Sequence, residues 1–108
     1  MSGGISVLIV TWNSEDYIGA CLQSLMMNVA RPLEIIVVDN CSSDKTTEIV
    51  SGFSNAQLIE TGANLGFAPA MNIAMQCASN PFVCLLNPAL ADHECCSAYC
   101  GDARRRLA

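Results

Sequence analysis

The sequence predicts an α/β domain in which a mostly parallel sheet is covered by helices on both faces. Two apolar, β-branched runs, residues 5–10 and 33–38, are continuous rather than alternating, as in strands that are buried on both faces. A segment with apolar residues at helical spacing lies between them, and further strand and helix patterns alternate behind them with short connections. This alternation favours parallel strands joined by helices that pack back onto the sheet.

The composition is that of a globular domain with one hydrophobic core. Of the 108 residues, 52% are apolar and only 14% are charged, which argues against disorder. The net charge is −5, and three of the five basic residues lie together at 104–106, so a nucleic-acid-binding surface is not expected. No stretch approaches the ~20 apolar residues of a membrane span, and the first residues lack the basic side chains of a secretion signal. We expect a cytoplasmic protein without a transmembrane segment.

The first half of the chain reads as strand, helix, strand and helix. Ser14 is suited to cap a helix at about residues 15–28. Glu15 and Asp16 then fall where the helix dipole favours negative charge. Pro32 prevents the helix from continuing into the second strand. The polar cluster at residues 42–44 supplies a second capping signal, and a second helix is expected behind it.

The second half continues the alternation and then loses it. A short strand is expected at residues 57–60, a helix at 68–78 and a fourth strand at 82–86. Pro69 is tolerable in the first turn of that helix. Residues 91–108 show no sustained period, and we expect an irregular tail there, either a frayed helix or disorder.

Polar residues gather where the expected strands end. In an open parallel sheet, ligands bind outside the carboxyl ends of the strands. Trp12, the only tryptophan, is placed to present an aromatic face to a base, and Asp39 is an acceptor suited to the imide N–H of uracil or thymine. The candidates at this rim are Thr11, Trp12 and Asn13, then Asp39 and Asn40, then Asn64 and Gly66, and finally Asn87.

A purely structural interpretation accounts for some of the same residues. Asp39, Asn40 and Ser42 are suited to a turn and a helix cap, and Trp12 to a half-buried position. The residues alone leave the two interpretations open. The chain has neither a G-x-G-x-x-G nor a G-x-x-x-x-G-K-[ST] motif, so dinucleotide and P-loop sites lose their support. Residues 11–14 are also a poor phosphate loop for a flavodoxin-like domain.

Four separated stretches resemble the family-two inverting glycosyltransferases, especially the bacterial rhamnosyltransferase-like branch that builds cell-surface polysaccharides. They are VLIVTWN at 7–13, LEIIVVDN at 33–40, NLGFA at 64–68 and LLNP at 85–88. The resemblance implies the N-terminal portion of a Rossmann-like GT-A three-layer sandwich. Residues 1–90 would be its nucleotide-sugar-binding part, and residues 91–108 a tail unlike the family. It also implies a UDP-, dTDP- or GDP-linked sugar as donor and transfer of that sugar to a hydroxyl acceptor.

The resemblance assigns a set of residues to nucleotide binding. The motif around Trp12 supplies an aromatic ring that stacks on the base, and Asp39 supplies the carboxylate that reads the base edge. The loop at 64–66 lies over the nucleotide, and two helix positions lie close to it. The full set is Thr11, Trp12, Asn13, Glu15, Asp39, Asn40, Asn64, Gly66, Asn72 and Asn87.

The sequence departs from the family at the metal motif. The resemblance implies a divalent metal, Mn or Mg, held between the diphosphate and an acidic motif that reads Asn-Pro-Asp in this branch. Here the third position is Ala89, which offers no oxygen ligand to a hard cation, so the metal ligands are unknown. Asp92 stands at the wrong spacing to replace it. No residue before 90 matches the general base of the family, so no catalytic residue is identifiable.

Two functions therefore remain open. The chain is either a truncated glycosyltransferase domain or a non-catalytic nucleotide-binding or structural remnant of that family. A partial sheet would leave an exposed edge strand, which predicts self-association. The cysteines imply no disulfide framework. The tail residues His93, Cys95, Cys96 and Cys100 lack the paired spacing of a structural zinc site.

Overall fold

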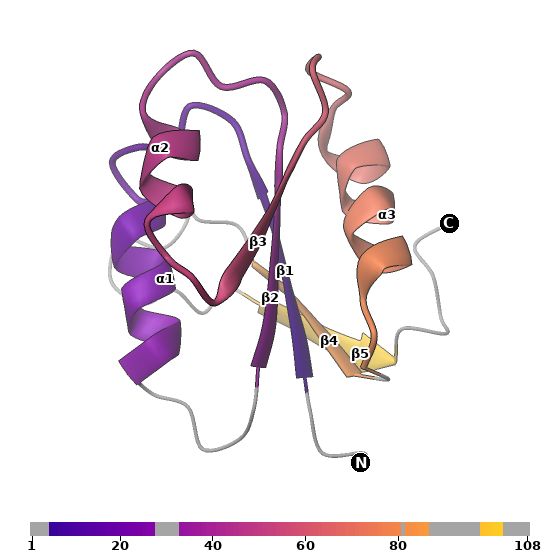
Figure 1. Cartoon of the computed structure of the whole chain (residues 1–108). Helices are drawn as coiled ribbons and strands as arrows, with labels where there is room; N and C mark the ends of the chain where they lie inside the picture. The colour runs from indigo at the N-terminus through magenta and orange to yellow at the C-terminus, as the bar shows by residue number, and fades with distance from the viewer. Residues whose placement is uncertain (1–4, 28–32, 81, 87–97, 103–108) are drawn as a thin grey trace.

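The computed structural model describes residues 5–27, 33–80, 82–86 and 98–102, and shows a sheet between two layers of helices (Figure 1). The α/β prediction is confirmed. In chain order the elements are β1 (Ile5–Thr11), α1 (Ile18–Met27), β2 (Leu33–Asp39), α2 (Thr46–Ser51), β3 (Ala56–Glu60), α3 (Phe67–Cys77), β4 (Phe82–Leu86) and β5 (Ala98–Asp102).

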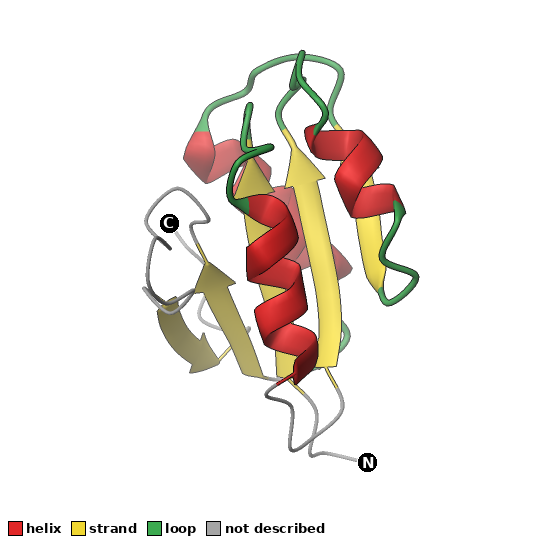
Figure 2. Cartoon of the chain, turned by 90° about the vertical axis from the view of Figure 1, so that its left-hand side faces the viewer, coloured by secondary structure: helices red, strands yellow, loops and turns green. Residues whose placement is uncertain are grey.

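The sheet is mostly parallel, as predicted, with strand order β3-β2-β1-β4-β5 among the described residues. The strands β1 to β4 pair in parallel, whereas β5 runs antiparallel to β4. In register, Thr11 stands opposite Asp39, and Asp39 stands opposite Glu60. The carboxyl ends of β1, β2 and β3 therefore lie level at one edge of the sheet, and Figure 2 shows the following loops gathered at this arrowhead end.

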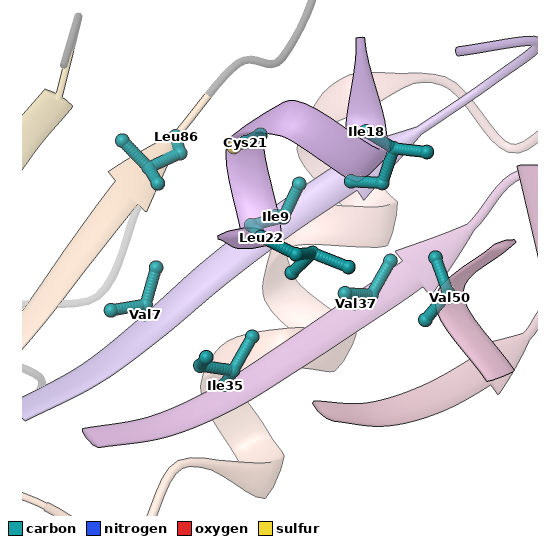
Figure 3. Close-up of a cluster of buried hydrophobic side chains, with 9 residues drawn as sticks. All are labelled: Val7, Ile9, Ile18, Cys21, Leu22, Ile35, Val37, Val50 and Leu86. Carbon is teal, nitrogen blue, oxygen red and sulfur yellow. The ribbon is translucent and has the colours of Figure 1, made fainter. Parts of the chain in front are cut away.

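One face of the sheet packs against α1 and α2. Val7 and Ile9 of β1 and the alternate residues of β2 point to this side, where they meet the buried side chains of Ile18, Leu22 and Val50 (Figure 3). The β-branched residues of the strands fill the space between the two helices and the sheet. Burial of this cluster fixes both helices, and with them the loops that precede each helix.

The other face packs against α3. Leu8, Ile36 and Val38 point to this side and meet Ala70, Met71 and Ala74 of the helix. Two of these three helix residues are alanines, whose small side chains allow a helix to approach a sheet closely. The connection after β3 therefore crosses to the face opposite α1 and α2 (Figure 1).

The start of α1 differs from the sequence prediction. The helix α1 begins at Ile18, not at residue 15, and residues 15–17 form a turn. Ser14 does not cap this helix through its side chain. Its backbone carbonyl accepts hydrogen bonds from the N–H groups of Tyr17 and Ile18 at 3.0 and 2.9 Å, and its hydroxyl lies 3.3 Å from both the N and the O of Trp12.

The expectation of an irregular tail is wrong for residues 98–102. These residues form β5, which pairs with the whole of β4 from Phe82 opposite Asp102 to Leu86 opposite Ala98. The tail carried no periodic signal because a five-residue edge strand needs only one neighbour and few apolar residues. Of the residues considered for zinc, His93, Cys95 and Cys96 lie outside the described residues, whereas Cys100 lies within β5, opposite Cys84 of β4.

A cluster at the amino edge of the sheet, which we call the Glu34 cluster, links β1, β2 and the end of the α3 region. Glu34 Oε1 accepts hydrogen bonds from the Ser6 hydroxyl at 2.6 Å and from the Ser79 N–H at 2.8 Å. Its Oε2 accepts the Ser79 hydroxyl at 2.6 Å. Burial raises the pKa of Glu34, but these three hydrogen bonds outweigh it and leave the pKa below the ordinary 4.5.

The described part of the chain contains no helix with both the length and the hydropathy needed to cross a membrane. Among its cysteines, Cys41 and Cys77 are exposed free thiols. Cys84 is disulfide-bonded, which the cysteine pattern did not predict.

Candidate functional site

A pocket of about 220 Å³ lies at the carboxyl edge of the sheet. Its walls come from the end of β1 and the following loop, from the loop after β2, and from the loop that leads into α3. Trp12 is 54% exposed and Phe67 is 50% exposed, so two aromatic side chains at the pocket keep half of their surface free. The lining residues are Val10, Trp12, Ser14, Asn40, Asn64, Gly66 and Phe67.

The pocket lies where a doubly wound sheet binds its ligands. Helices α1 and α2, which follow β1 and β2, cover one face, and α3, which follows β3, covers the other, so the loops after β1 and β3 leave the carboxyl edge in opposite directions. No charged side chain lines the pocket among the described residues. An aromatic, uncharged pocket of this size suits a flat, neutral heterocycle better than a phosphate group.

The structure brings four of the predicted nucleotide-binding residues together in the pocket lining. They are Trp12, Asn40, Asn64 and Gly66. Thr11, Asn13, Glu15, Asp39 and Asn72 do not line it. Asn87 lies outside the described residues.

The lining also contains residues that the sequence interpretation did not nominate. Phe67 had a usable signal, because it stands inside the stretch NLGFA that was assigned to the nucleotide loop. Val10 and Ser14 had none: one looks like any strand residue, and the other looks like a helix cap.

Asp39 is buried behind the pocket, with 1% of its surface exposed. Its Oδ1 accepts the hydroxyl protons of Thr11 and Ser42 at 2.7 and 2.6 Å, and its Oδ2 accepts the N–H of Ser42 at 2.8 Å. The carboxylate therefore ties the ends of β1 and β2 to the next loop, which agrees with the turn interpretation. Base reading by Asp39 stays a prediction, and it requires a nucleotide N–H to join or replace these donors.

Asn40 fastens the loop at 64–66 to the end of β2. Its Nδ2 donates to the carbonyl of Gly66 at 3.0 Å, and its Oδ1 accepts the N–H of Leu65 at 3.1 Å. In addition, Asn64 Oδ1 accepts a hydrogen bond from the N–H of Gly66 at 3.0 Å. Gly66 has a φ of 89°, a conformation that disfavours side chains, so this position needs glycine for its backbone geometry. The rim of the pocket is thus held in place by amide side chains.

Asn13 and Glu15 turn away from the pocket toward the loop at 42–46. Asn13 Oδ1 accepts the N–H of Ser43 at 2.8 Å, and Glu15 Oε1 accepts the N–H of Lys45 at 2.9 Å. In return, Asp44 Oδ2 accepts the N–H of Glu15 at 3.1 Å. Desolvation raises the pKa of Asp44, but hydrogen bonds from Thr46 and Glu15 outweigh it and lower the pKa below 3.8.

The described residues do not fit a metal site. They contain no group of three or more His, Cys, Asp or Glu side chains that could hold an ion. The position that resembles the family's metal-binding Asp is Ala89, whose methyl group has no lone pair to donate. Residues 87–97 themselves lie outside the described residues.

The sequence matches the model of the glycosyl transferase family 2 over residues 6–95. The N-acetylglucosaminyl-diphospho-decaprenol L-rhamnosyltransferase of Mycobacterium tuberculosis is 34% identical over 73 residues, which are 67% of this chain and 24% of that protein. The poly(ribitol-phosphate) beta-N-acetylglucosaminyltransferase TarS of Staphylococcus aureus is 35% identical over 85 residues, which cover 72% of this chain and 15% of that protein.

Solved structures agree with these relatives. The structure of Staphylococcus aureus TarS in complex with UDP-GlcNAc has a TM-score of 0.74 at 32% identity, and the match covers 80% of this chain and 26% of that chain. The mannosyltransferase PcManGT from Pyrobaculum calidifontis, in complex with GDP-Man and Mn²⁺, has a TM-score of 0.71 at 26% identity and covers 78% and 27%. The fold is that of the GT-A glycosyltransferases, and this chain spans about a quarter of those solved chains. The chain belongs to the glycosyl transferase family 2.

Proposed function

We propose that the pocket binds the nucleoside of a nucleotide-diphosphate sugar, the donor for sugar transfer to a hydroxyl acceptor in surface polysaccharide synthesis. One observation carries this proposal: an uncharged pocket with two half-exposed aromatic side chains stands at the carboxyl edge of the sheet. The family supports the donor class, because TarS has been crystallised with UDP and with UDP-GlcNAc, and PcManGT with GDP-Man.

The aromatic and the polar residues of the pocket have different roles in nucleotide binding. Trp12 stacks on the base, and Phe67 adds a second apolar surface. Asn40, Asn64 and Gly66 form the rim that covers the nucleoside. Thr11 and Asp39 support the site through their mutual hydrogen bond at the ends of β1 and β2, and Asn72 and Asn87 stay predicted nucleotide-binding residues.

Donor binding is the part of the reaction that we assign to the described residues. In transfer with inversion, an acceptor hydroxyl attacks the anomeric carbon as the bond to the nucleoside diphosphate breaks. A general base must take the hydroxyl proton, and none of the described residues is assigned that role. Ala89, which stands where the resemblance implies a metal-binding Asp, favours a second candidate function, a non-catalytic nucleotide-binding module.

We expect metal dependence to distinguish this chain from PcManGT. PcManGT was crystallised with Mn²⁺, and a bound divalent ion stabilises a leaving diphosphate. Because Ala89 supplies no ligand, we expect nucleotide binding by this chain to depend little on added Mn²⁺ or Mg²⁺.

Calorimetry with UDP, dTDP and GDP, each with and without Mn²⁺, tests the proposal. Binding of one nucleotide in the micromolar to millimolar range, with little change on adding Mn²⁺, is the expected result. A complete lack of binding by all three would refute the nucleotide pocket. Detectable sugar transfer to a hydroxyl acceptor would exclude the non-catalytic alternative.

We also propose self-association and a cytoplasmic location. Within the described residues β3 has a neighbour on one side only, so its other side presents backbone groups that a second strand can pair with. Light scattering is expected to report a dimer or larger species, and a uniform monomer at high concentration would contradict this.

A further inference from the structure

The loop at 13–15 is fastened to the loop at 42–46 by hydrogen bonds that run in both directions. Glu15 accepts from the backbone of Lys45 at 2.9 Å, while Asp44 accepts from the backbone of Glu15 at 3.1 Å. Each carboxylate thus satisfies a backbone N–H of the other loop. We call the contacts between these two loops the clasp.

A second reciprocal pair lies beside the first. Asn13 Oδ1 accepts the N–H of Ser43 at 2.8 Å, and the N–H of Asn13 donates to the Ser42 hydroxyl at 2.8 Å. Asn13 has a φ of 49°, in the left-handed region that asparagine tolerates better than most residues. The residue therefore serves the clasp through both its backbone conformation and its side chain.

The clasp adjoins Trp12 directly. The N–H of Ser14 donates to the hydroxyl of Thr46 at 2.8 Å inside the protein, and the Ser14 hydroxyl lies 3.3 Å from the backbone N and O of Trp12. The Trp12 side chain is 54% exposed, so packing restrains it only partly. Its position at the pocket depends on the backbone that carries it, and the clasp holds that backbone on its C-terminal side.

We propose that Asn13, Glu15 and Asp44 are positioning residues that set nucleotide affinity through Trp12. This inference rests on the proposed nucleotide pocket. None of the three residues lines the pocket. Each has a side-chain oxygen that accepts a backbone N–H from the opposite loop, and Asp44 also accepts the N–H of Thr46 in its own loop. An aromatic side chain that is already ordered in the free protein loses less conformational entropy when the base binds, which lowers the free-energy cost of binding.

Glu15→Ala and Glu15→Gln form the central pair of variants. Alanine removes the acceptor for the Lys45 N–H, whereas glutamine keeps a neutral acceptor oxygen at the same place. Glu48→Ala is the matched control, because Glu48 is an exposed carboxylate on α2 that does not line the pocket. Asn13→Gly and Asn13→Asp repeat the comparison: glycine keeps the backbone conformation without the acceptor, and aspartate keeps the acceptor oxygen.

Trp12 supplies the readout, since it is the only tryptophan. Time-resolved fluorescence anisotropy of the nucleotide-free chain measures the local motion of Trp12, and calorimetry with UDP measures affinity. In Glu15→Ala and Asn13→Gly we expect larger local motion and a Kd about fivefold higher, the change expected from one lost hydrogen bond. Glu15→Gln, Asn13→Asp and Glu48→Ala should keep the original anisotropy and affinity. Thermal unfolding identifies any variant that fails to fold. If a Glu15 variant does not fold, the two Asn13 variants provide the test, and if an Asn13 variant does not fold, the two Glu15 variants provide it.

Two results would overturn the proposal. Unchanged Trp12 motion in folded Glu15→Ala and Asn13→Gly would show that the clasp does not hold Trp12. A Glu15→Gln variant as impaired as Glu15→Ala would show that the negative charge acts, and not the acceptor oxygen. If the unaltered chain bound none of UDP, dTDP and GDP, the proposed nucleotide pocket would fail, while the anisotropy of the free chain would still decide whether the clasp positions Trp12.

Discussion

The two edges of the sheet carry polar clusters of similar chemistry and different surroundings. At the amino edge, both carboxylate oxygens of Glu34 accept hydrogen bonds from Ser6 or Ser79 within the cluster. At the carboxyl edge, Asp39 is equally well bonded to Thr11 and Ser42, yet the aromatic surface of Trp12 stands exposed beside it. A satisfied network of hydrogen bonds by itself therefore does not mark a binding site.

The carboxyl edge differs from the amino edge because aromatic surface remains exposed there after folding. Trp12 and Phe67 keep about half of their area in water at the pocket, although burying an aromatic ring is favourable. The amide and carboxylate groups behind them hold three loops still. We infer that the polar residues of this edge build the pocket and that the aromatic residues supply its affinity.

Replacing Asp39 should have the largest effect on folding. Asp39→Ala leaves the Thr11 hydroxyl and the Ser42 N–H without their buried acceptor, which should lower the free energy of unfolding by about 3 kcal/mol. Urea denaturation followed by circular dichroism measures the loss. Glu60→Ala is the control, because Glu60 stands opposite Asp39 in β3 but is exposed, and a change of about 0.5 kcal/mol or less is expected. Equal stability of the two variants would remove Asp39 from the framework of the site.

Replacing Trp12 should reverse this pattern, with a loss of binding and little loss of stability. Stacking of a base on an aromatic ring contributes about 1–3 kcal/mol, so Trp12→Ala should raise the Kd for UDP by about one order of magnitude or more. Its exposed side chain contributes little to the core. Tyr17→Ala is the control, because Tyr17 is exposed nearby on the same loop but does not line the pocket. If both variants bound UDP equally well, stacking on Trp12 would be excluded.

The fold was predictable because its signals are local and repeated. The continuous apolar runs of β1 and β2 can be buried only by helices on both faces, and the alternation of elements then dictates a parallel sheet. The strand β5 escaped prediction, since its pairing with β4 depends on a distant partner and not on a pattern of its own.

The site was predictable only in part, for a different reason. Sequence order places polar residues at the ends of strands, but it does not say which way a side chain turns there. Asn40 and Asp39 are neighbours, and only Asn40 lines the pocket, while Asp39 points into the framework behind it. Phe67 lines the pocket because the crossing of the chain into α3 brings it there, and only its place in the stretch NLGFA pointed to this position in advance.

The Glu34 cluster should show the smallest effect and a distinct pH dependence. Its hydrogen bonds hold the pKa of Glu34 below the unfolded value of 4.5, so they favour the charged form in the folded protein. The contribution to stability is therefore fully present above about pH 4.5 and is lost as the pH falls through the lowered folded pKa. Because Glu34 is partly exposed, solvent screening should limit the contribution to about 1 kcal/mol or less.

Urea denaturation of the unaltered chain and of Glu34→Gln measures this contribution. The difference in the free energy of unfolding between the two proteins should shrink from pH 6 toward pH 3, whereas nucleotide affinity at pH 7 should be unchanged. A pH-independent difference would mean that the shape of the Glu34 side chain, and not its charge, holds this edge together, and a loss of affinity would mean that the two edges are coupled through the sheet.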